Sequence, residues 1–343
     1  MGKKITVYDI AKEAGVSAAT VSRVLTGNVQ VKGKTKDKVL AIISKYNFQP
    51  SSVARSLKAR RSKMIGFIVP DITNPFFSQL FLEVEIRATE HDYTVILCNS
   101  HSNSRRESQI LDTFLAKEVE AIIFSGGRID NMQISKSQLQ EIERVNHIIP
   151  LITCSELPGG KCIQMINNER QGIYTLVEHL YSLGHRSLGM IGGRDDVLPS
   201  HKRRMFMIEA AEQYGMTVKK DWLIQGEFSI TAGAECMEQL LRRVQLPTAV
   251  MAFNDVVAIG ASSTLYQHGY TVPDDMALTG YDGIPLTQNV VPSITTMATP
   301  FAFFADRIMA TILSGQGAGQ VSETVMDLQL VVGDSTMRNR PQV

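Results

Sequence analysis

The stretch Val7–Thr26, VYDIAKEAGVSAATVSRVLT, decides the fold of the N-terminal part of the chain. Its apolar residues recur every three or four positions, the spacing of a helix with one buried face, and they form one stripe on each side of Gly15. Gly15 can adopt the positive φ that ends a helix, and Ser17 can cap the next one. The stretch predicts a helix-turn-helix, whose second helix enters the DNA major groove. An ordinary αα-hairpin shares so short a signature, so the rest of the chain has to decide.

The charge of the chain is divided unevenly. Residues 1–63 carry 14 Lys and Arg against 3 Asp and Glu, a net charge of +11, whereas the whole chain has a net charge of +1 and the remainder therefore −10. A basic head on an acidic body indicates that the head alone meets a polyanion. A solvated basic tail is the alternative, but the apolar periodicity of the head predicts that it folds. Nucleic-acid binding is the favoured interpretation.

A third amphipathic helix and a polar linker follow the first two helices. Residues Thr35–Tyr46, TKDKVLAIISKY, place aliphatic side chains on one face and lysines on the other. Pro50 ends this unit, and the segment SSVARSLK after it could form only one or two helical turns, which need a partner surface for stability. We therefore expect an all-α DNA-binding head at residues 1–49 and a hinge linker helix at residues 50–63.

From Met64 onward, apolar runs of strand length alternate with helical segments, and a polar strand is expected near residues 223–228. This alternation predicts parallel sheets covered by helices on both faces, and it occurs in two successive halves. We expect an α/β body of two doubly wound parallel-sheet lobes, with ligands bound at the carboxyl ends of the strands. The expected boundaries are about 64–166 and 294–325 for the first lobe, and about 167–293 and 326–343 for the second.

Several function classes lack their sequence signals. The four cysteines form no C-x-x-C pair, and the seven histidines show no metal-ligand spacing. No G-x-G-x-x-G after a strand, G-x-x-x-x-G-K-[S/T], H-E-x-x-H or G-x-S-x-G is present. Neither a signal-peptide core nor an apolar run of membrane length occurs. We expect a cytoplasmic protein without a metal, a cofactor, a membrane partner or an enzymatic activity.

The whole chain resembles the lac-repressor/galactose-repressor family of bacterial transcription regulators. The resemblance is carried by TVYDIAKEAGVSAATVSRVLTGN with the downstream PSSVARSLK, and by PDITNPFF, EHLYSLGHRSLGMIGG, PTAVMAFNDVVAIGA and GYDGIPLTQNVVPSITTM. It implies a homodimer that binds a pseudo-palindromic double-stranded DNA operator, and a body of the periplasmic-binding-protein type. Residues 333–343 contain no leucine heptad, so a tetramer-forming coiled coil is not expected.

The resemblance also implies a set of DNA contacts. Ser17–Leu25 would be the recognition helix, and base-specific hydrogen bonding falls on Arg23, because two alanines stand where relatives often carry polar residues. A phosphate or surface role is the alternative for Arg23. Leu57 matches the leucine that family members insert into the minor groove, where an apolar wedge unstacks and bends the duplex. The implied DNA-binding residues are Thr6, Tyr8, Ser17, Ala18, Ala19, Thr20, Ser22, Arg23, Asn28, Thr35, Ala54, Arg55, Leu57 and Lys58.

A second set of residues would bind a small effector, such as a sugar, a sugar derivative or a nucleoside, between the lobes. Aromatic faces pack against the C–H surface of a polyol, while charged and amide groups bind its hydroxyls. Asn167 departs from the aspartate that many relatives carry. Three assignments have purely structural alternatives. Arg203 could be a helix-surface residue, Asp282 a turn residue, and Phe76 and Phe77 core residues. The implied residues are Phe76, Phe77, Asn167, Arg203, Phe228, Asn254 and Asp282.

The function that the resemblance implies is repression of a sugar or related catabolic operon, with the effector shifting the equilibrium between two lobe arrangements. Ordered linker helices would permit tight operator binding, and disordered ones would not. A regulator controlled by a protein partner is one alternative. A secreted sugar-binding protein or an enzyme on the same α/β body are the others. The basic head and the missing signal peptide argue against the first, and the missing catalytic motifs argue against the second.

Overall fold

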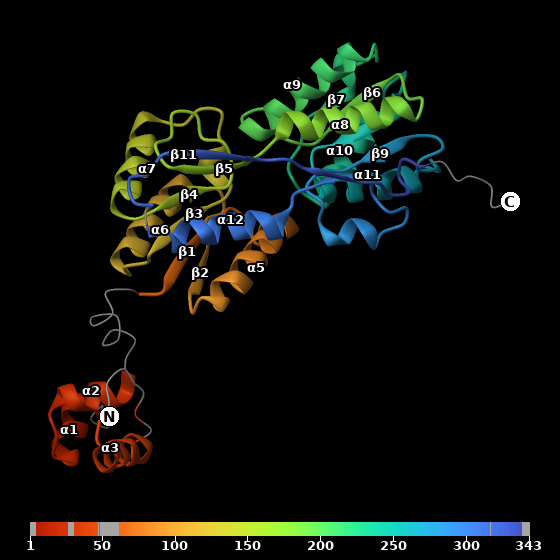
Figure 1. Ribbon diagram of the computed structural model, residues 1–343. Helices are drawn as coiled ribbons and strands as arrows, with labels where there is room; N and C mark the ends of the chain where they lie inside the picture. The colour runs from red at the N-terminus through yellow and green to blue at the C-terminus, as the bar shows by residue number, and fades with distance from the viewer. Residues whose placement is uncertain (1–4, 27–30, 47, 49–61, 316, 338–343) are drawn as a thin grey trace. The chain divides into compact units, whose positions relative to one another are not determined.

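A computed structural model describes residues 5–26, 31–46, 48, 62–315 and 317–337. The chain forms two compact units, Met1–Ser62 and Lys63–Val343, which we call the head and the body (Figure 1). Most of the predicted hinge lies outside the described residues, so its expected helix stays a prediction.

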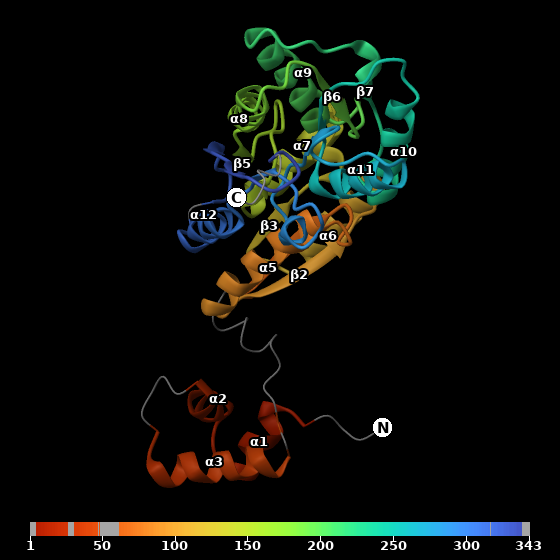
Figure 2. The same ribbon diagram turned by 90° about the vertical axis from the view of Figure 1, so that its right-hand side faces the viewer.

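The described residues of the head form three helices (Figure 2). These helices pack around one small apolar core. The core centres on Ile10, Val21 and Val39, one fully buried side chain from each helix. The first two helices are those that the sequence predicts, and the third begins two residues earlier than expected. The helices are α1 (Val7–Ala14), α2 (Ala18–Thr26) and α3 (Gly33–Lys45).

The turn between α1 and α2 follows its local sequence. Gly15 has a φ of +68°, which a glycine adopts without strain, and the Val16 N–H reaches back to the Ala11 carbonyl oxygen at 3.0 Å. Ser17 then caps α2, because its Oγ accepts the Thr20 N–H at 3.2 Å. The predicted helix-turn-helix is confirmed.

The first lobe of the body is built on a six-stranded parallel sheet in the order β11-β5-β4-β3-β1-β2. Its strands are β1 (Met64–Val69), β2 (Thr94–Asn99), β3 (Ala121–Phe124), β4 (Leu151–Thr153), β5 (Ile163–Asn167) and β11 (Ser322–Met326). Successive side chains of β1 pack on opposite faces, so two separate cores form. Helices α5 (Pro75–Glu90) and α12 (Phe301–Leu313) cover one face, and α6 (Ser104–Ala116) and α7 (Lys136–Ile148) cover the other.

The second lobe repeats this plan on a four-stranded parallel sheet in the order β7-β6-β8-β9. The strands are β6 (Leu188–Ile191), β7 (Leu223–Ile224), β8 (Ala249–Ala252) and β9 (Ala277–Thr279). Helices α8 (Glu169–Ser182) and α9 (Leu198–Gln213) cover one face, and α10 (Ile230–Leu241) and α11 (Asp255–Gln267) cover the other. Strand β7 is shorter than the expected strand at residues 223–228, because residues 227–229 line the cavity described below.

The chain crosses between the lobes three times within the described residues. It leaves the first lobe after β5, returns between β10 (Thr296–Ala298) and α12, and leaves again between β11 and β12 (Gln329–Val331). Strand β10 pairs with β12, and its Ala298 bridges to Asp282; Thr295, just before β10, bridges to Thr279 of β9. The return to the first lobe therefore follows residue 298, which differs from the expected boundary at 294. Short 3₁₀ turns complete the body: η1 (Gly127–Asp130), η2 (Lys220–Trp222) and η3 (Pro285–Gln288).

Candidate functional site

Helix α2 of the head has one buried face and one exposed face. Val21 and Val24 point into the core, whereas Ala19 and Arg23, one helical turn apart, are exposed on the other side. A side chain on that exposed face can reach the base edges of a groove. This placement agrees with the role expected for Arg23, which stays a prediction.

Three of the predicted DNA contacts, Thr6, Ser17 and Thr20, also hold the head together. The Thr6 hydroxyl donates to the Asp9 carboxylate at 2.6 Å, and the Asp9 N–H donates to Thr6 Oγ1 at 3.3 Å, so the pair forms a capping box at the start of α1. Ser17 and Thr20 share a hydrogen bond of 2.9 Å between their hydroxyls. These hydroxyls therefore have structural roles whether or not they meet DNA.

The remaining predicted DNA contacts fall into two groups. Within the described residues, Tyr8 is 77% exposed, and Ala18, Ser22 and Thr35 are partly buried. The rest lie outside the described residues: Asn28, Ala54, Arg55, Leu57 and Lys58. Their roles stay predictions.

The body holds a cavity of about 1090 Å³ between the two lobes. The residues around it follow the ends of strands β1, β3, β4, β5, β6, β7, β8 and β9, which is where parallel sheets bind ligands. All seven residues predicted to contact an effector line this cavity: Phe76, Phe77, Asn167, Arg203, Phe228, Asn254 and Asp282. The structure thus brings the whole predicted set together from both lobes.

Arg203 lies at the centre of the charged groups and is only 6% exposed. Its Nε and Nη2 atoms donate to the two carboxylate oxygens of Glu169 at 2.7 and 3.0 Å, and Nη1 donates to the Phe253 carbonyl oxygen at 2.8 Å. Burial disfavours the charged guanidinium, but Glu169, Tyr281 and Asp282 together outweigh it and raise the pKa of Arg203 above its ordinary value. Arg203 is a buried, fully charged residue and not the helix-surface arginine of the alternative interpretation.

Asp282 lies 3.6 Å from Arg203 Nη1 in a strained part of the backbone. Its φ of +110° favours glycine, and two backbone hydrogen bonds hold it: its N–H donates to Met297 at 2.9 Å, and its carbonyl oxygen accepts from Thr299 at 3.0 Å. Burial raises the pKa of Asp282 well above its ordinary value, although Arg203 opposes this. The strain orients a buried carboxylate toward the cavity.

Aromatic rings line both walls of the cavity. Phe76 and Phe77 meet edge to face with ring centroids 5.3 Å apart, and both pack against the core of the first lobe. On the second lobe, Phe228 and Phe253 are 5.0 Å apart. The interpretation of Phe76 as core and its interpretation as cavity lining are therefore both correct. Opposed aromatic walls form a slot suited to a flat ligand with C–H faces.

The side-chain amides of Asn254 and Asn167 each form one hydrogen bond within the protein. Asn254 caps α11, with its Oδ1 accepting the Val257 N–H at 3.0 Å. Asn167 Nδ2 donates to the Thr299 hydroxyl at 3.0 Å, whereas its Oδ1 is buried and has no hydrogen-bond partner among the described residues. A buried acceptor without a donor is costly, and a bound hydroxyl or amine would relieve that cost.

Sequence reasoning missed several charged residues of the cavity, among them Asp130, Glu169 and Lys202. Lys202 pairs with Glu156 across the lobes. Asp130 accepts from the Ser155 hydroxyl, and burial raises its pKa to about 6 although that hydrogen bond lowers it. The available signal was position: each of the three lies in the loop or helix start that follows a strand.

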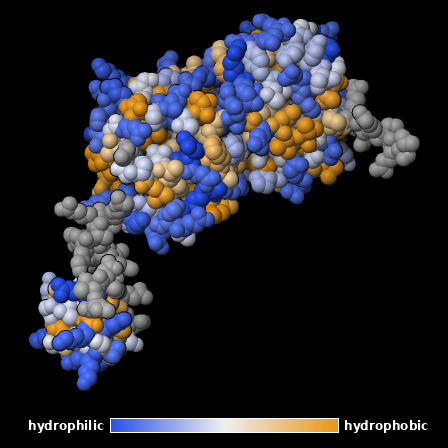
Figure 3. All heavy atoms as spheres, in the orientation of Figure 1, coloured by the Kyte–Doolittle hydropathy of each residue, from blue (hydrophilic) through white to orange (hydrophobic). Residues whose placement is uncertain are grey.

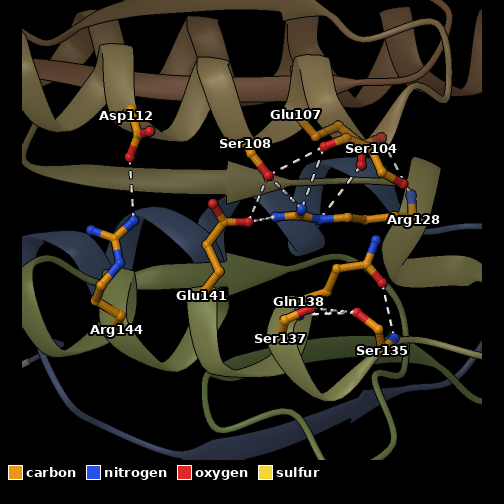
Figure 4. Close-up of polar contacts among 10 residues, drawn as sticks. All are labelled: Ser104, Glu107, Ser108, Asp112, Arg128, Ser135, Ser137, Gln138, Glu141 and Arg144. Carbon is orange, nitrogen blue, oxygen red and sulfur yellow. Dashed lines mark hydrogen bonds and ion pairs between the residues drawn. The ribbon is translucent and has the colours of Figure 1, made fainter.

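A buried ionic network supports the cavity wall that carries Asp130 (Figure 4). Arg128, 1% exposed, lies 3.5 Å from the Glu107 carboxylate and donates to Glu141 at 2.7 Å and to the Ser108 hydroxyl at 2.9 Å. The network joins η1 to α6 and α7. A wall braced in this way holds its polar groups in position for a ligand.

Other kinds of site find no support within the described ranges. Residues 5–26, 31–46, 48, 62–315 and 317–337 contain no group of three His, Cys, Asp or Glu that could hold a metal ion. No helix in these ranges is long and apolar enough to cross a membrane. All four cysteines are free, and burial raises the pKa of the Cys162 thiol to about 11.

The chain matches two known protein families. Residues 6–51 match the bacterial regulatory proteins of the lacI family, and residues 177–336 match the periplasmic binding protein-like domain. It is 33% identical over 335 residues to the HTH-type transcriptional regulator DegA of Bacillus subtilis, covering 97% of this chain and 98% of DegA. It is 30% identical to the HTH-type transcriptional repressor CytR of Escherichia coli, with 96% of each chain covered.

A solved structure of the lac repressor dimer bound to operator and the anti-inducer ONPF has the same fold, with a TM-score of 0.86 and 24% sequence identity. That comparison covers 98% of this chain and 100% of the lac repressor chain. The head carries a confirmed helix-turn-helix, and the relatives over almost the full length are regulators and not enzymes. This chain therefore belongs to the lacI family of bacterial regulatory proteins and is a DNA-binding transcription regulator.

Proposed function

We propose that the protein represses a sugar or related catabolic operon and that a small ligand bound in the cavity changes its affinity for the operator. The observation that carries this proposal is the convergence of all seven expected contact residues on one cavity between the lobes. The ligand class is a polyol such as a sugar, a sugar derivative or a nucleoside, because aromatic walls and buried hydrogen-bonding groups suit its two kinds of surface.

Relatives support the ligand class by analogy. One solved structure with a TM-score of 0.67 and 22% identity is a complex of the transcriptional regulator CelR with cellobiose. Another, from Enterococcus faecium, is a lacI-family regulator with bound ribose, with a TM-score of 0.67 and 25% identity. A lobe-bridging ligand favours one arrangement of the lobes and shifts the equilibrium by its differential affinity.

Two copies of the chain would act together on a pseudo-palindromic operator in the cytoplasm. Apolar side chains gather on the second lobe over α10 and α11 (Figure 3). Ile230, the first residue of α10, is 47% exposed. Leu82 and Ile86 on α5 are 46% and 43% exposed on the first lobe. A homodimer would cover such surfaces and pair the two heads, each followed by a hinge at residues 50–63.

The test is selection of genomic fragments by the purified full-length protein, followed by titration of the best fragment against sugars and nucleosides. We expect a palindromic site beside a catabolic operon and one compound that changes the affinity for it. Enrichment of fragments without a shared palindrome would contradict the proposal. Modulation by a partner protein, without any active compound, would favour the alternative in which a protein controls the regulator.

A further inference from the structure

The guanidinium of Arg203, the one buried cation of the cavity lining, is already neutralised. Glu169 binds it with both carboxylate oxygens at 2.7 and 3.0 Å, in the fork-to-fork geometry that gives the strongest pairing. Asp282 lies 3.6 Å from the same guanidinium. Two carboxylates thus face one cation, so this group of residues has no positive charge left for an anionic ligand.

The other basic groups of the cavity lining are also paired with acids, so they too leave little positive charge for a ligand. Acidic side chains outnumber basic ones in its lining. Lys202 pairs with Glu156, and Arg194 pairs with Asp196 at 2.6 Å and with Glu227 at 3.5 Å. Asp130, in contrast, forms no ion pair within the part of the chain that the structure describes.

A separate observation shows what the cavity requires of a ligand. The Oδ1 atom of Asn167 is buried at the cavity and lacks a hydrogen-bond donor among the residues described. Together with the Asp130 carboxylate, it makes the inner surface rich in acceptors. A ligand that donates hydrogen bonds satisfies these atoms, whereas a carboxylate or phosphate would bring further acceptors and like charge into a desolvated site.

We propose that Glu169 is a specificity-determining residue: by neutralising Arg203, it restricts the cavity to polyols that are uncharged or carry an amine, and it excludes carboxylates and phosphates. The inference rests on the proposed function, since it names the ligand class of the same site. The paired Arg203 still orients the ligand through its rigid position. An amine on the ligand would lie against Asp130, which has no cationic partner of its own.

A purely structural role for Glu169 predicts different behaviour. An acid in the first turn of α8 stabilises that helix through its dipole, and its loss would then lower stability without changing the order of ligands. The order of ligands by charge is therefore the property that separates the two roles.

The experiment uses full-length protein and sets of compounds that share a skeleton and differ in charge. One set is glucose, glucosamine, glucuronate and glucose 6-phosphate; the corresponding ribose compounds, and nucleosides with their monophosphates, extend it. Thermal shift and calorimetry give the affinities. The wild type should bind the uncharged or amine-bearing member of a set and not its anionic counterparts. Glu169→Gln should raise the affinity for an anionic member relative to the uncharged one by about tenfold or more.

Glu178→Gln is the matched control, because it removes the same charge from an exposed position on the same helix, outside the cavity lining. It should leave the order of ligands unchanged. Where Glu169→Gln does not fold, Asp130→Asn keeps the Glu169–Arg203 pair, and it should weaken an amine-bearing ligand relative to the uncharged one by about tenfold.

Each outcome has one meaning. Tighter binding of a carboxylate or phosphate than of its uncharged counterpart by the wild type would overturn the inference and leave the proposed function standing. An unchanged order of ligands in both cavity variants would also overturn it. Absence of any effect of any compound on thermal stability and operator affinity, in wild type and variants alike, would overturn the proposed function itself.

Discussion

The buried carboxylate of Asp255 accepts the backbone N–H of Ile284 at 2.8 Å, and so ties the start of α11 to the loop that follows β9. Its other oxygen accepts the Thr296 hydroxyl at 2.6 Å, and its own N–H donates to Tyr281. Asp282 lies inside this loop. Asp255 therefore holds the strained backbone that presents Asp282 to the cavity.

Replacement of Asp255 tests this relationship. Asp255→Ala leaves two buried donors without an acceptor, so we expect a loss of about 2–4 kcal/mol in the free energy of unfolding. Urea denaturation followed by the fluorescence of Trp222, the one tryptophan of the chain, measures it. Asp274→Ala, at an exposed position of the same lobe, should have little effect. Equal stability of the two variants would show that the hydrogen bonds of the Asp255 carboxylate do not stabilise the fold.

The pH dependence of stability follows from the buried acids. Burial raises the pKa of Asp130 from 3.8 to about 6 and that of Asp255 from 3.8 to about 7. Between pH 4 and pH 7 the native body thus binds more protons at these sites than the unfolded chain, so their contribution to stability is present below pH 4 and lost as pH rises. Melting temperatures of Asp130→Asn should show a weaker decline over this range, and a slope equal to that of the wild type would contradict the assignment.

Arg23 should determine which operator is preferred. Arg23→Ala is expected to cost about 1–3 kcal/mol of binding free energy at the preferred operator and much less at unrelated DNA. Thr35→Ala, which removes an expected phosphate contact, should weaken both alike. Titration of labelled DNA at a fixed salt concentration gives the comparison, and an unchanged preference in Arg23→Ala would refute the base-reading role.

Leu57 lies outside the described residues, and its wedge role remains a prediction from the family resemblance. Leu57→Ala should reduce the bending of the operator and the specific affinity, because no apolar side chain would then unstack the central base step. Energy transfer between dyes on the two ends of the DNA measures the bend, and sedimentation checks that the dimer persists. A bend as large as that of the wild type would contradict the proposed insertion of Leu57 between base pairs.

The buried pair of Arg128 and Glu107 offers a double-mutant test of the cavity wall. Arg128→Met leaves an uncompensated buried carboxylate and should lower the free energy of unfolding by about 3–5 kcal/mol. Arg128→Met with Glu107→Gln should recover much of that loss, because both charges are then gone. Denaturation followed by circular dichroism measures each variant. Strictly additive effects of the two changes would show that the pair does not interact.

Much of the fold could be predicted because its signals are local. The positive φ of Gly15, the cap by Ser17 and the alternation of strands with helices each depend on residues a few positions apart. The same alternation placed the ligand site at the strand ends, and the family motifs then named the seven residues that line the cavity. Strand β7 is shorter than expected, because the residues after Ile224 turn into the cavity wall, and a local pattern does not show that turn.

The charge of the cavity could not be read in this way. Glu169 and Arg203 lie on different helices, and Arg128 reaches Glu107 and Glu141 only through the packing of η1 against two helices. The residues next to Glu169 in the sequence do not distinguish it from a solvent-exposed acid at the start of a helix.

The sequence by itself determined the helix-turn-helix head, the two-lobed parallel body and the family, because periodicity, capping and motif spacing act over short distances along the chain. Only the tertiary structure decided which charges meet. Residues far apart in sequence become neighbours when helices that follow different strands pack on the same face of a sheet, as α8 and α9 do, and burial there makes each pairing strong. The neutralisation of Arg203 by Glu169 is a property of that arrangement, and so is the acceptor-rich character of the cavity.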